Sequence, residues 1–360
     1  MEKKKLLFKS PLLYHRYHGG GFLFPNKLFF FCFLSVCIIS CIFFFSTNLS
    51  AEKYKSADNL LGNKVIDINE QTTVMEIINH PLFKGYGQFI FPTEHGLPPQ
   101  NMKISQIQSL LPYHSHIDTQ TTIDVLNYMQ NEVSQGNIIF YDIYSAAEKK
   151  ADPSKKNTGL FFFRGKPNTP FAVICAGGSF SYVGSIHESF PHALKLSQKG
   201  YNAFALQYRT GSAQSAYEDL AAAITFIFKN ASALGVNTNC YSLWGSSAGA
   251  RMAAYFGSYT TEAFGQEKLP RPGAVIMQYT GHTDYTCNDP PTYVCVGEND
   301  YIANWKIMQR RINNLSSLGI ETEFHKYPRL EHGFGLGVGT TADGWIDEAV
   351  VFWEKQMKHY

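Results

Sequence analysis

Two adjacent serines lie in a glycine-flanked motif in the second half of the chain. The motif reads Gly-Ser-Ser-Ala-Gly at residues 245–249, and an apolar run over residues 240–244 precedes it. A sharp strand-to-helix turn strains the backbone at its serine, so the positions two residues away must lack bulk. The turn exposes the hydroxyl of Ser247 and points the N–H of Ala248 at a developing oxyanion. The motif therefore predicts nucleophilic acyl transfer with Ser247 as the nucleophile.

A serine nucleophile needs a general base, and the base needs an acid to orient it. Among twelve histidines, His332 stands out because it follows the last apolar run and precedes the final helical segment. Asp300 lies just beyond another apolar run, over residues 293–296. We therefore predict His332 as the base and Asp300 as the acid. The rival acids are Asp284, Asp289 and Glu298, whereas Glu331 is too close to His332 along the chain to orient it. The histidines expected to pack or to lie on the surface are His114, His116, His187 and His192.

A second glycine-bearing segment precedes the serine motif by one strand and one helix. The apolar run at residues 171–175 ends in Ala176-Gly177-Gly178-Ser179. A strand that ends in small residues lets the backbone approach a ligand closely, and a loop at this place supplies further oxyanion donors in such sites. The same residues are also compatible with an ordinary turn from strand to helix.

Strand-like and helix-like segments alternate from residue 137 onward. Short runs rich in β-branched and aromatic residues are typical of strands buried on both faces. They occupy residues 138–144, 160–163, 171–175, 203–208, 240–244, 274–279, 293–296 and 323–327. Helical segments are expected at residues 185–199, 216–230, 249–256, 304–318 and 342–357, and before the sheet at 104–111 and 121–133. This alternation predicts a single α/β domain with a mostly parallel sheet and helices on both faces.

The segment from about residue 160 to the end resembles α/β hydrolases of the acetyl-esterase and hormone-sensitive-lipase-like carboxylesterase group. Ser247, Asp300 and His332 occur in the chain order that this fold uses. The resemblance implies oxyanion donors at the backbone of Gly178, Ser179 and Ala248. This chain has Ala-Gly-Gly-Ser where the family usually has His-Gly-Gly-Gly or Pro-Gly-Gly-Gly, which weakens assignment to the lipase branch. Residues 279–282 and Trp345 either line the pocket or pack the core.

The N-terminal residues have the composition of a targeting segment. Six basic side chains and one acidic side chain precede residue 28, and residues 28–45 form an uninterrupted apolar run. We predict that residues 1–51 are a signal peptide or a membrane anchor, which implies an exported protein. Residues 52–136 are expected to form an extension or a cap, and residues 137–360 the catalytic domain. Membrane contact is expected only through the N-terminal segment.

Composition limits the other classes of function. Apolar residues make up 44% of the chain and charged residues 17%, so a large core can be buried. The net charge of +2 comes from the N-terminal residues, and the body has no basic excess for nucleic acid. The seven cysteines show no zinc-ligand spacing, and the chemistry needs no cofactor. An export context would permit one disulfide.

The sequence thus favours a serine esterase for short acyl groups, including acetyl groups on carbohydrates. Two alternatives stay open. One is a serine peptidase of the prolyl-oligopeptidase type, although no propeller-sized N-terminal domain is present in this sequence. The other is a hydrolase fold that binds a ligand without catalysis, because a fold alone does not determine function.

Overall fold

A computed structural model of the chain describes residues 65–358. The predicted signal or anchor at residues 1–51 lies outside this range. All described residues fall in one compact unit, which begins at Asn63. None of the helices between residues 65 and 358 is long and apolar enough to cross a membrane.

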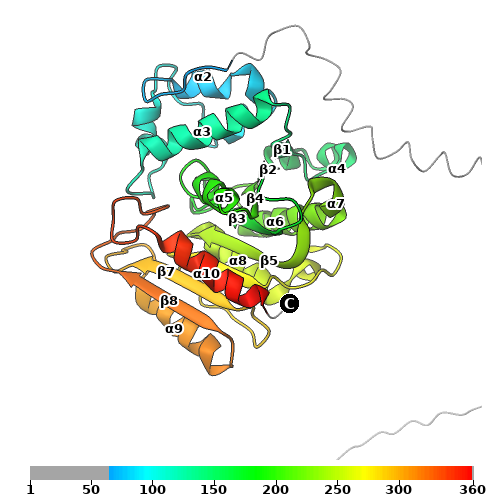
Figure 1. Ribbon diagram of the computed structural model, residues 1–360, viewed down its shortest axis with the longest axis vertical. Helices are drawn as coiled ribbons and strands as arrows, with labels where there is room; N and C mark the ends of the chain where they lie inside the picture. Colours follow the sequence, from blue (N-terminus) through cyan, green and yellow to red (C-terminus); the bar gives the residue numbers. More distant parts are fainter. Residues whose placement is uncertain (1–64, 359–360) are drawn as a thin grey trace, which may run out of the picture. The chain divides into compact units, whose positions relative to one another are not determined.

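The core of the unit is one eight-stranded sheet (Figure 1). Its strand order is β1-β2-β4-β3-β5-β6-β7-β8. The β1–β2 and β2–β4 pairs are antiparallel, and every other neighbouring pair is parallel. The predicted mostly parallel sheet of an α/β domain is confirmed.

Each of the eight apolar runs contains a strand. The strands are β1 (Phe140–Tyr141), β2 (Gly159–Phe163), β3 (Pro170–Cys175), β4 (Asn202–Gln207), β5 (Asn237–Ser246), β6 (Ala274–Gln278), β7 (Thr292–Gly297) and β8 (Thr322–Tyr327). Strands β2, β4, β6 and β7 are buried along their whole length, as expected for strands covered on both faces. The run at residues 138–144 was predicted too long, because only two of its residues pair with β2.

Helices cover both faces of the sheet. Those of the α/β core are α5 (Ser189–Gln198), α6 (Ala213–Lys229), α8 (Ala248–Tyr259), α9 (Trp305–Ser317) and α10 (Trp345–Met357). Helix α5 connects β3 to β4, which lies on the β1 side of β3 in the sheet. The connections that contain α6, α8 and α9 run the other way, toward β8. Right-handed crossovers therefore place α5 on the other face from those three. Helix α10 shares the α5 face, because the rings of His192 and Trp345 lie 5.3 Å apart.

Residues 65–139 pack beside α5 (Figure 1). Helix α2 (Val74–Ile78) starts with a capping box between Thr73 and Glu76, and α3 (Thr119–Ser134) starts at an Asp118 cap. The predicted helix at residues 104–111 is a 3₁₀ helix, Ile104–Leu110. Further 3₁₀ turns span Pro81–Phe83 and Gly87–Phe89. The role of this segment as a cap stays a prediction.

The cysteines and four short segments complete the described structure. They are α4 (Ala146–Ala151), α7 (Ala231–Leu234) and two 3₁₀ helices at Pro153–Asn157 and Thr261–Phe264. Of the four cysteines in residues 65–358, Cys287 is exposed and the other three are buried, and all four are free thiols.

Candidate active site

Ser247 lies in a strained turn between β5 and α8. Its backbone has φ 51° and ψ −112°, a conformation that residues with a side chain rarely adopt. A Cβ at Gly245 would come within 2.3 Å of the Gly249 backbone, and one at Gly249 within 1.9 Å of a carbonyl oxygen of β3. Both glycines are therefore required by close backbone contacts, and the turn holds the serine at the carboxyl edge of the sheet.

His332 lies on the loop after β8 and reaches Ser247 across the edge of the sheet. Its Nε2 atom is 3.1 Å from Ser247 Oγ, and its Nδ1 atom is 2.7 Å from Asp300 Oδ2. His332 and Asp300 are each 7% exposed. The three predicted residues therefore form one continuous hydrogen-bond chain, in which the serine hydroxyl faces the imidazole.

Asp300 is fixed by its own loop as well as by the histidine. Its second oxygen, Oδ1, accepts hydrogen bonds from the N–H groups of Ile302 (2.8 Å) and Ala303 (2.6 Å). Oδ2 is thereby directed at the imidazole, so the Nδ1 atom of His332 carries the proton and Nε2 is free to accept one.

The rival acids lie elsewhere. Asp284 accepts a hydrogen bond from the hydroxyl of Tyr259, and Asp289 pairs with Arg311. Glu298 pairs with Lys326, and Glu331 lies near His116 on the surface. None of these four carboxylates contacts His332.

The loop after β3 lies directly against Ser247. A Cβ at Gly177 would come within 2.9 Å of the Ser247 Cβ atom. Gly178, Ser179 and Phe180 follow, with φ values of 130°, 58° and 57°. Within residues 65–358, the N–H groups of Gly178, Ser179 and Ala248 donate no hydrogen bond to the protein. Three backbone donors without a partner beside a serine hydroxyl are the arrangement an oxyanion requires.

A buried carboxylate that the sequence did not single out lies beneath this loop. Glu188 is 0% exposed and accepts hydrogen bonds from the N–H of Gly177 and from the hydroxyl of Tyr279. His114 Nε2 is 3.1 Å from Glu188 Oε1. Burial alone raises the pKa of Glu188, but the neighbouring His114 and the hydrogen bonds outweigh it and lower this pKa to about 2. Glu188 is therefore ionised at neutral pH.

The segments whose role the sequence left open divide between core and site. Trp345 packs in the core and donates from Nε1 to the carbonyl of Gly335, close to His332. The Tyr279 ring lies edge-on to the His332 ring, with centroids 4.8 Å apart. His282 is buried and its Nε2 atom has no hydrogen-bond partner among the described residues.

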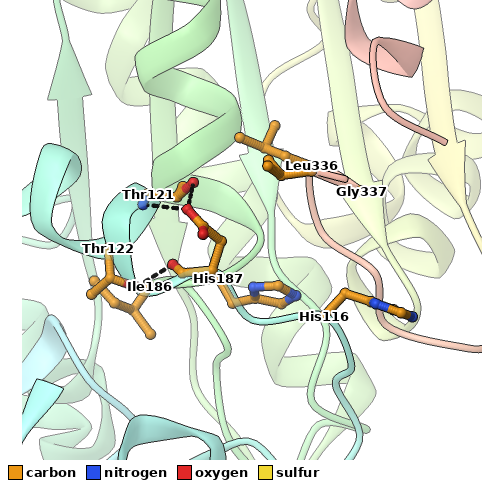
Figure 2. A pocket seen from close by; sticks show the side chains of 9 residues that line it. His116, Thr121, Thr122, Ile186, His187, Leu336 and Gly337 are labelled. Atoms are coloured by element: carbon orange, nitrogen blue, oxygen red, sulfur yellow. Dashed lines mark hydrogen bonds between the residues drawn. The ribbon is translucent and has the colours of Figure 1, made fainter. Parts of the chain in front are cut away.

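A small pocket lies next to the His332 loop but does not include the triad (Figure 2). It has room for about one water molecule, about 10 Å³. Figure 2 shows His116 and His187 across the pocket from Leu336 and Gly337. Burial lowers the pKa of His187 to about 4, and its Nε2 atom donates to the carbonyl of Gly333. Because the pocket is this small, we assign it no substrate.

No group of three or more His, Cys, Asp or Glu side chains in residues 65–358 is arranged to hold a metal ion.

Comparison with known proteins concerns the fold and the family of the chain. The BD-FAE family model, for bifunctional acetyl xylan esterases and feruloyl esterases, matches residues 163–283. No curated protein matches the chain. A solved acetyl ester-xyloside bifunctional hydrolase from Caldicellulosiruptor lactoaceticus is similar, with a TM-score of 0.54 and 19% identity over 60% of this chain and 95% of that one. A sugar hydrolase, YeeB, from Lactococcus lactis has a TM-score of 0.50 and 22% identity over 56% and 95%. The chain therefore has the predicted α/β-hydrolase fold and matches the BD-FAE family model over residues 163–283.

Proposed function

We propose that this protein is a serine carboxylic-ester hydrolase that acts through an acyl-enzyme. The observation that carries the proposal is the hydrogen-bond chain from Asp300 through His332 to Ser247. Its order and geometry are those of a nucleophile, a base and an orienting acid. The strained serine turn and the unpaired N–H groups around it add support.

The proposed reaction has two half-reactions. His332 Nε2 takes the proton of Ser247 Oγ as this oxygen attacks the ester carbonyl, and Asp300 stabilises the imidazolium that forms. The N–H groups of Gly178, Ser179 and Ala248 stabilise the tetrahedral oxyanion. His332 then protonates the departing alcohol, which leaves an acyl group on Ser247. Water, deprotonated by His332, attacks this ester, and the carboxylic acid is released as the serine recovers its proton.

We propose short acyl esters as the substrate class, and acetyl groups on carbohydrates within it. The BD-FAE match supports this choice, because its name refers to esterases of acetylated xylan and of feruloyl esters. The test is a panel of p-nitrophenyl esters from acetyl to octanoyl, with acetylated xylo-oligosaccharides and methyl ferulate. A higher kcat/KM for octanoyl than for acetyl esters would contradict the short-chain proposal.

The adjacent serines offer a matched pair of variants. Ser247→Ala removes the nucleophile and is expected to lower kcat on p-nitrophenyl acetate by roughly 10⁴- to 10⁶-fold. Ser246→Ala removes a buried hydroxyl that donates to the Gln278 side chain at 2.7 Å, so it is expected to affect stability more than rate. Equal activity of Ser247→Ala and wild type would refute the proposal.

Two further assays separate the alternatives. A serine peptidase of the prolyl-oligopeptidase type would cleave aminoacyl-proline p-nitroanilides, whereas a carboxylic-ester hydrolase would leave these amide bonds intact. A non-catalytic binding protein would not react with a fluorophosphonate probe while folded. Fast ester turnover and probe labelling, without cleavage of the p-nitroanilides, would exclude both.

We also propose that the protein is exported, with residues 1–51 as its signal or anchor. The support is the basic start followed by the apolar run at residues 28–45. Fractionation of the host cells, with mass spectrometry of the mature N-terminus, tests the proposal. An intact N-terminus on protein that is entirely in the cytosol would contradict it.

A further inference from the structure

Glu188 connects the two loops that the proposed reaction depends on. One carboxylate oxygen accepts from the N–H of Gly177, at the start of the loop that lies against Ser247. The other accepts from the hydroxyl of Tyr279 at 2.8 Å, and Tyr279 accepts from the N–H of Gly335 at 3.1 Å. Gly335 belongs to the loop of His332. A single buried side chain thus holds the oxyanion side and the base side of the site.

The geometry at Gly177 shows how Glu188 acts on the donors. A Cβ on Gly177 would lie 2.8 Å from Glu188 Oε2 and 2.9 Å from the Ser247 Cβ atom, so both groups flank the same backbone position. The hydrogen bond from Gly177 fixes the peptide plane just before three successive residues with positive φ. Those residues include Gly178 and Ser179, whose N–H groups must point at one oxyanion position.

Residues 113–115, which come from the segment before the sheet, complete the connection. His114 pairs with Glu188 through Nε2 and faces the hydroxyl of Tyr182 with Nδ1 at 2.9 Å. Tyr182 in turn donates its N–H to the carbonyl of Gly178. Ser115 donates its hydroxyl to the carbonyl of His332 at 2.7 Å and its N–H to the carbonyl of Gly333 at 2.9 Å. This short segment therefore contacts both loops as well.

We propose that Glu188 is a positioning residue that orients the oxyanion donors. Residues 113–115 fix the positions of Glu188 and of the His332 loop relative to each other. The inference rests on the proposed esterase function. A buried charge is a costly way to stabilise a core, because well-packed apolar residues of similar volume are often as stable or more so. A buried carboxylate whose partners include both active-site loops is therefore better explained by a role in positioning these loops than by a contribution to the stability of the fold.

Three substitutions at Glu188 separate geometry from charge. Glu188→Gln keeps the length and an acceptor for the Gly177 N–H but removes the charge. Glu188→Asp keeps the charge but is one methylene too short to reach Gly177 in the same backbone, and Glu188→Ala removes the acceptor. Loss of a whole oxyanion donor costs about 10²- to 10³-fold in kcat. Because misaligned donors retain part of their effect, we expect Glu188→Ala and Glu188→Asp to lose about 10- to 100-fold and Glu188→Gln less than 10-fold.

The diagnostic readout is the affinity of a trifluoromethyl ketone, whose adduct with Ser247 mimics the tetrahedral oxyanion. If Glu188 positions the donors, the Ki of the trifluoromethyl ketone rises in Glu188→Ala by about the factor by which kcat falls. The KM for p-nitrophenyl acetate changes less than threefold. Asp289→Asn is the matched control, because Asp289 is a buried carboxylate whose partners are Arg311 and Thr286. It is expected to lower the melting temperature without changing Ki.

The outcomes are distinct. An unchanged Ki in folded Glu188→Ala, or Glu188→Asp more active than Glu188→Gln, would overturn the positioning role. Ser115→Ala offers an independent check that does not disturb the buried charge. It is expected to lower kcat by about 2- to 10-fold, the range for one lost hydrogen bond. If Ser247→Ala stays active, the proposed esterase function fails. If only Ser247→Ala is inactive and Glu188 variants behave as wild type, this inference alone fails.

Discussion

The orientation of Asp300 makes Asp300→Asn a sharp test of the site. Two backbone N–H groups, from Ile302 and Ala303, point at Oδ1. In the variant the amide oxygen must occupy this position, because an amide NH₂ there would face two donors. The NH₂ group then faces His332 Nδ1, which has to accept a hydrogen bond. The imidazole is thereby held with its proton on Nε2, opposite the hydroxyl of Ser247.

A base that already carries the proton on Nε2 cannot take another from Ser247 without forming an unstabilised cation. The equivalent change in a serine protease triad lowers kcat by about 10⁴-fold, which is about 5 kcal/mol of transition-state stabilisation. We expect the same loss here, with KM little changed. The assay is p-nitrophenyl acetate turnover at neutral pH, with burst kinetics to separate acylation from deacylation.

Glu298→Gln is the control for this experiment. Glu298 lies two residues before Asp300, is half-buried, and pairs with Lys326. Its replacement is expected to change kcat less than twofold. A folded Asp300→Asn variant that keeps a tenth or more of the wild-type kcat would refute the assignment of Asp300 as the orienting acid.

Two further predictions concern stability. Gly249→Ala places a Cβ 1.9 Å from a backbone oxygen, so we expect a loss of about 3 kcal/mol or more in urea unfolding, whereas Gly257→Ala, whose Cβ would lie 3.0 Å from a side-chain methyl group, should lose less. Burial lowers the pKa values of His187, His192 and His282 to about 4. Below pH 6.5 the unfolded chain binds protons that the folded chain does not, so stability should fall as pH drops from 6.5 to 4, by about 3 kcal/mol per histidine at most. The free energy of unfolding in urea, plotted against pH over this range, should have a slope about one third smaller in His192→Phe than in the wild type. An unchanged slope would contradict the assignment of this pH dependence to the buried histidines.

Local sequence patterns were sufficient to predict the sheet and the three residues of the triad. The apolar runs predicted strands because buried parallel strands are apolar along their length. Ser247 was recognisable because its neighbours must be glycines, and the structure shows the backbone contacts that exclude larger residues at positions 245 and 249. His332 and Asp300 were found from their places after strands, where the loops at the carboxyl edge carry chemistry. Their catalytic roles stay a prediction.

The network around Glu188 could not be predicted in this way. Glu188 lies in a segment read as helix, and nothing in its neighbourhood distinguishes a buried carboxylate from a surface one. His114 was expected to pack or to lie on the surface, and it is buried, but its partner is 74 positions away in the chain. Pairings of this kind depend on tertiary structure, because no local rule specifies which polar groups meet in a core.

The most direct test of the central claim is the identity of the residue that a fluorophosphonate probe modifies. The folded protein should react stoichiometrically with the probe, lose its esterase activity in parallel, and carry the adduct on Ser247 in peptide mass spectrometry. Ser246→Ala should be labelled in the same way. Esterase activity that survives full labelling, or an adduct on any residue other than Ser247, would contradict the account.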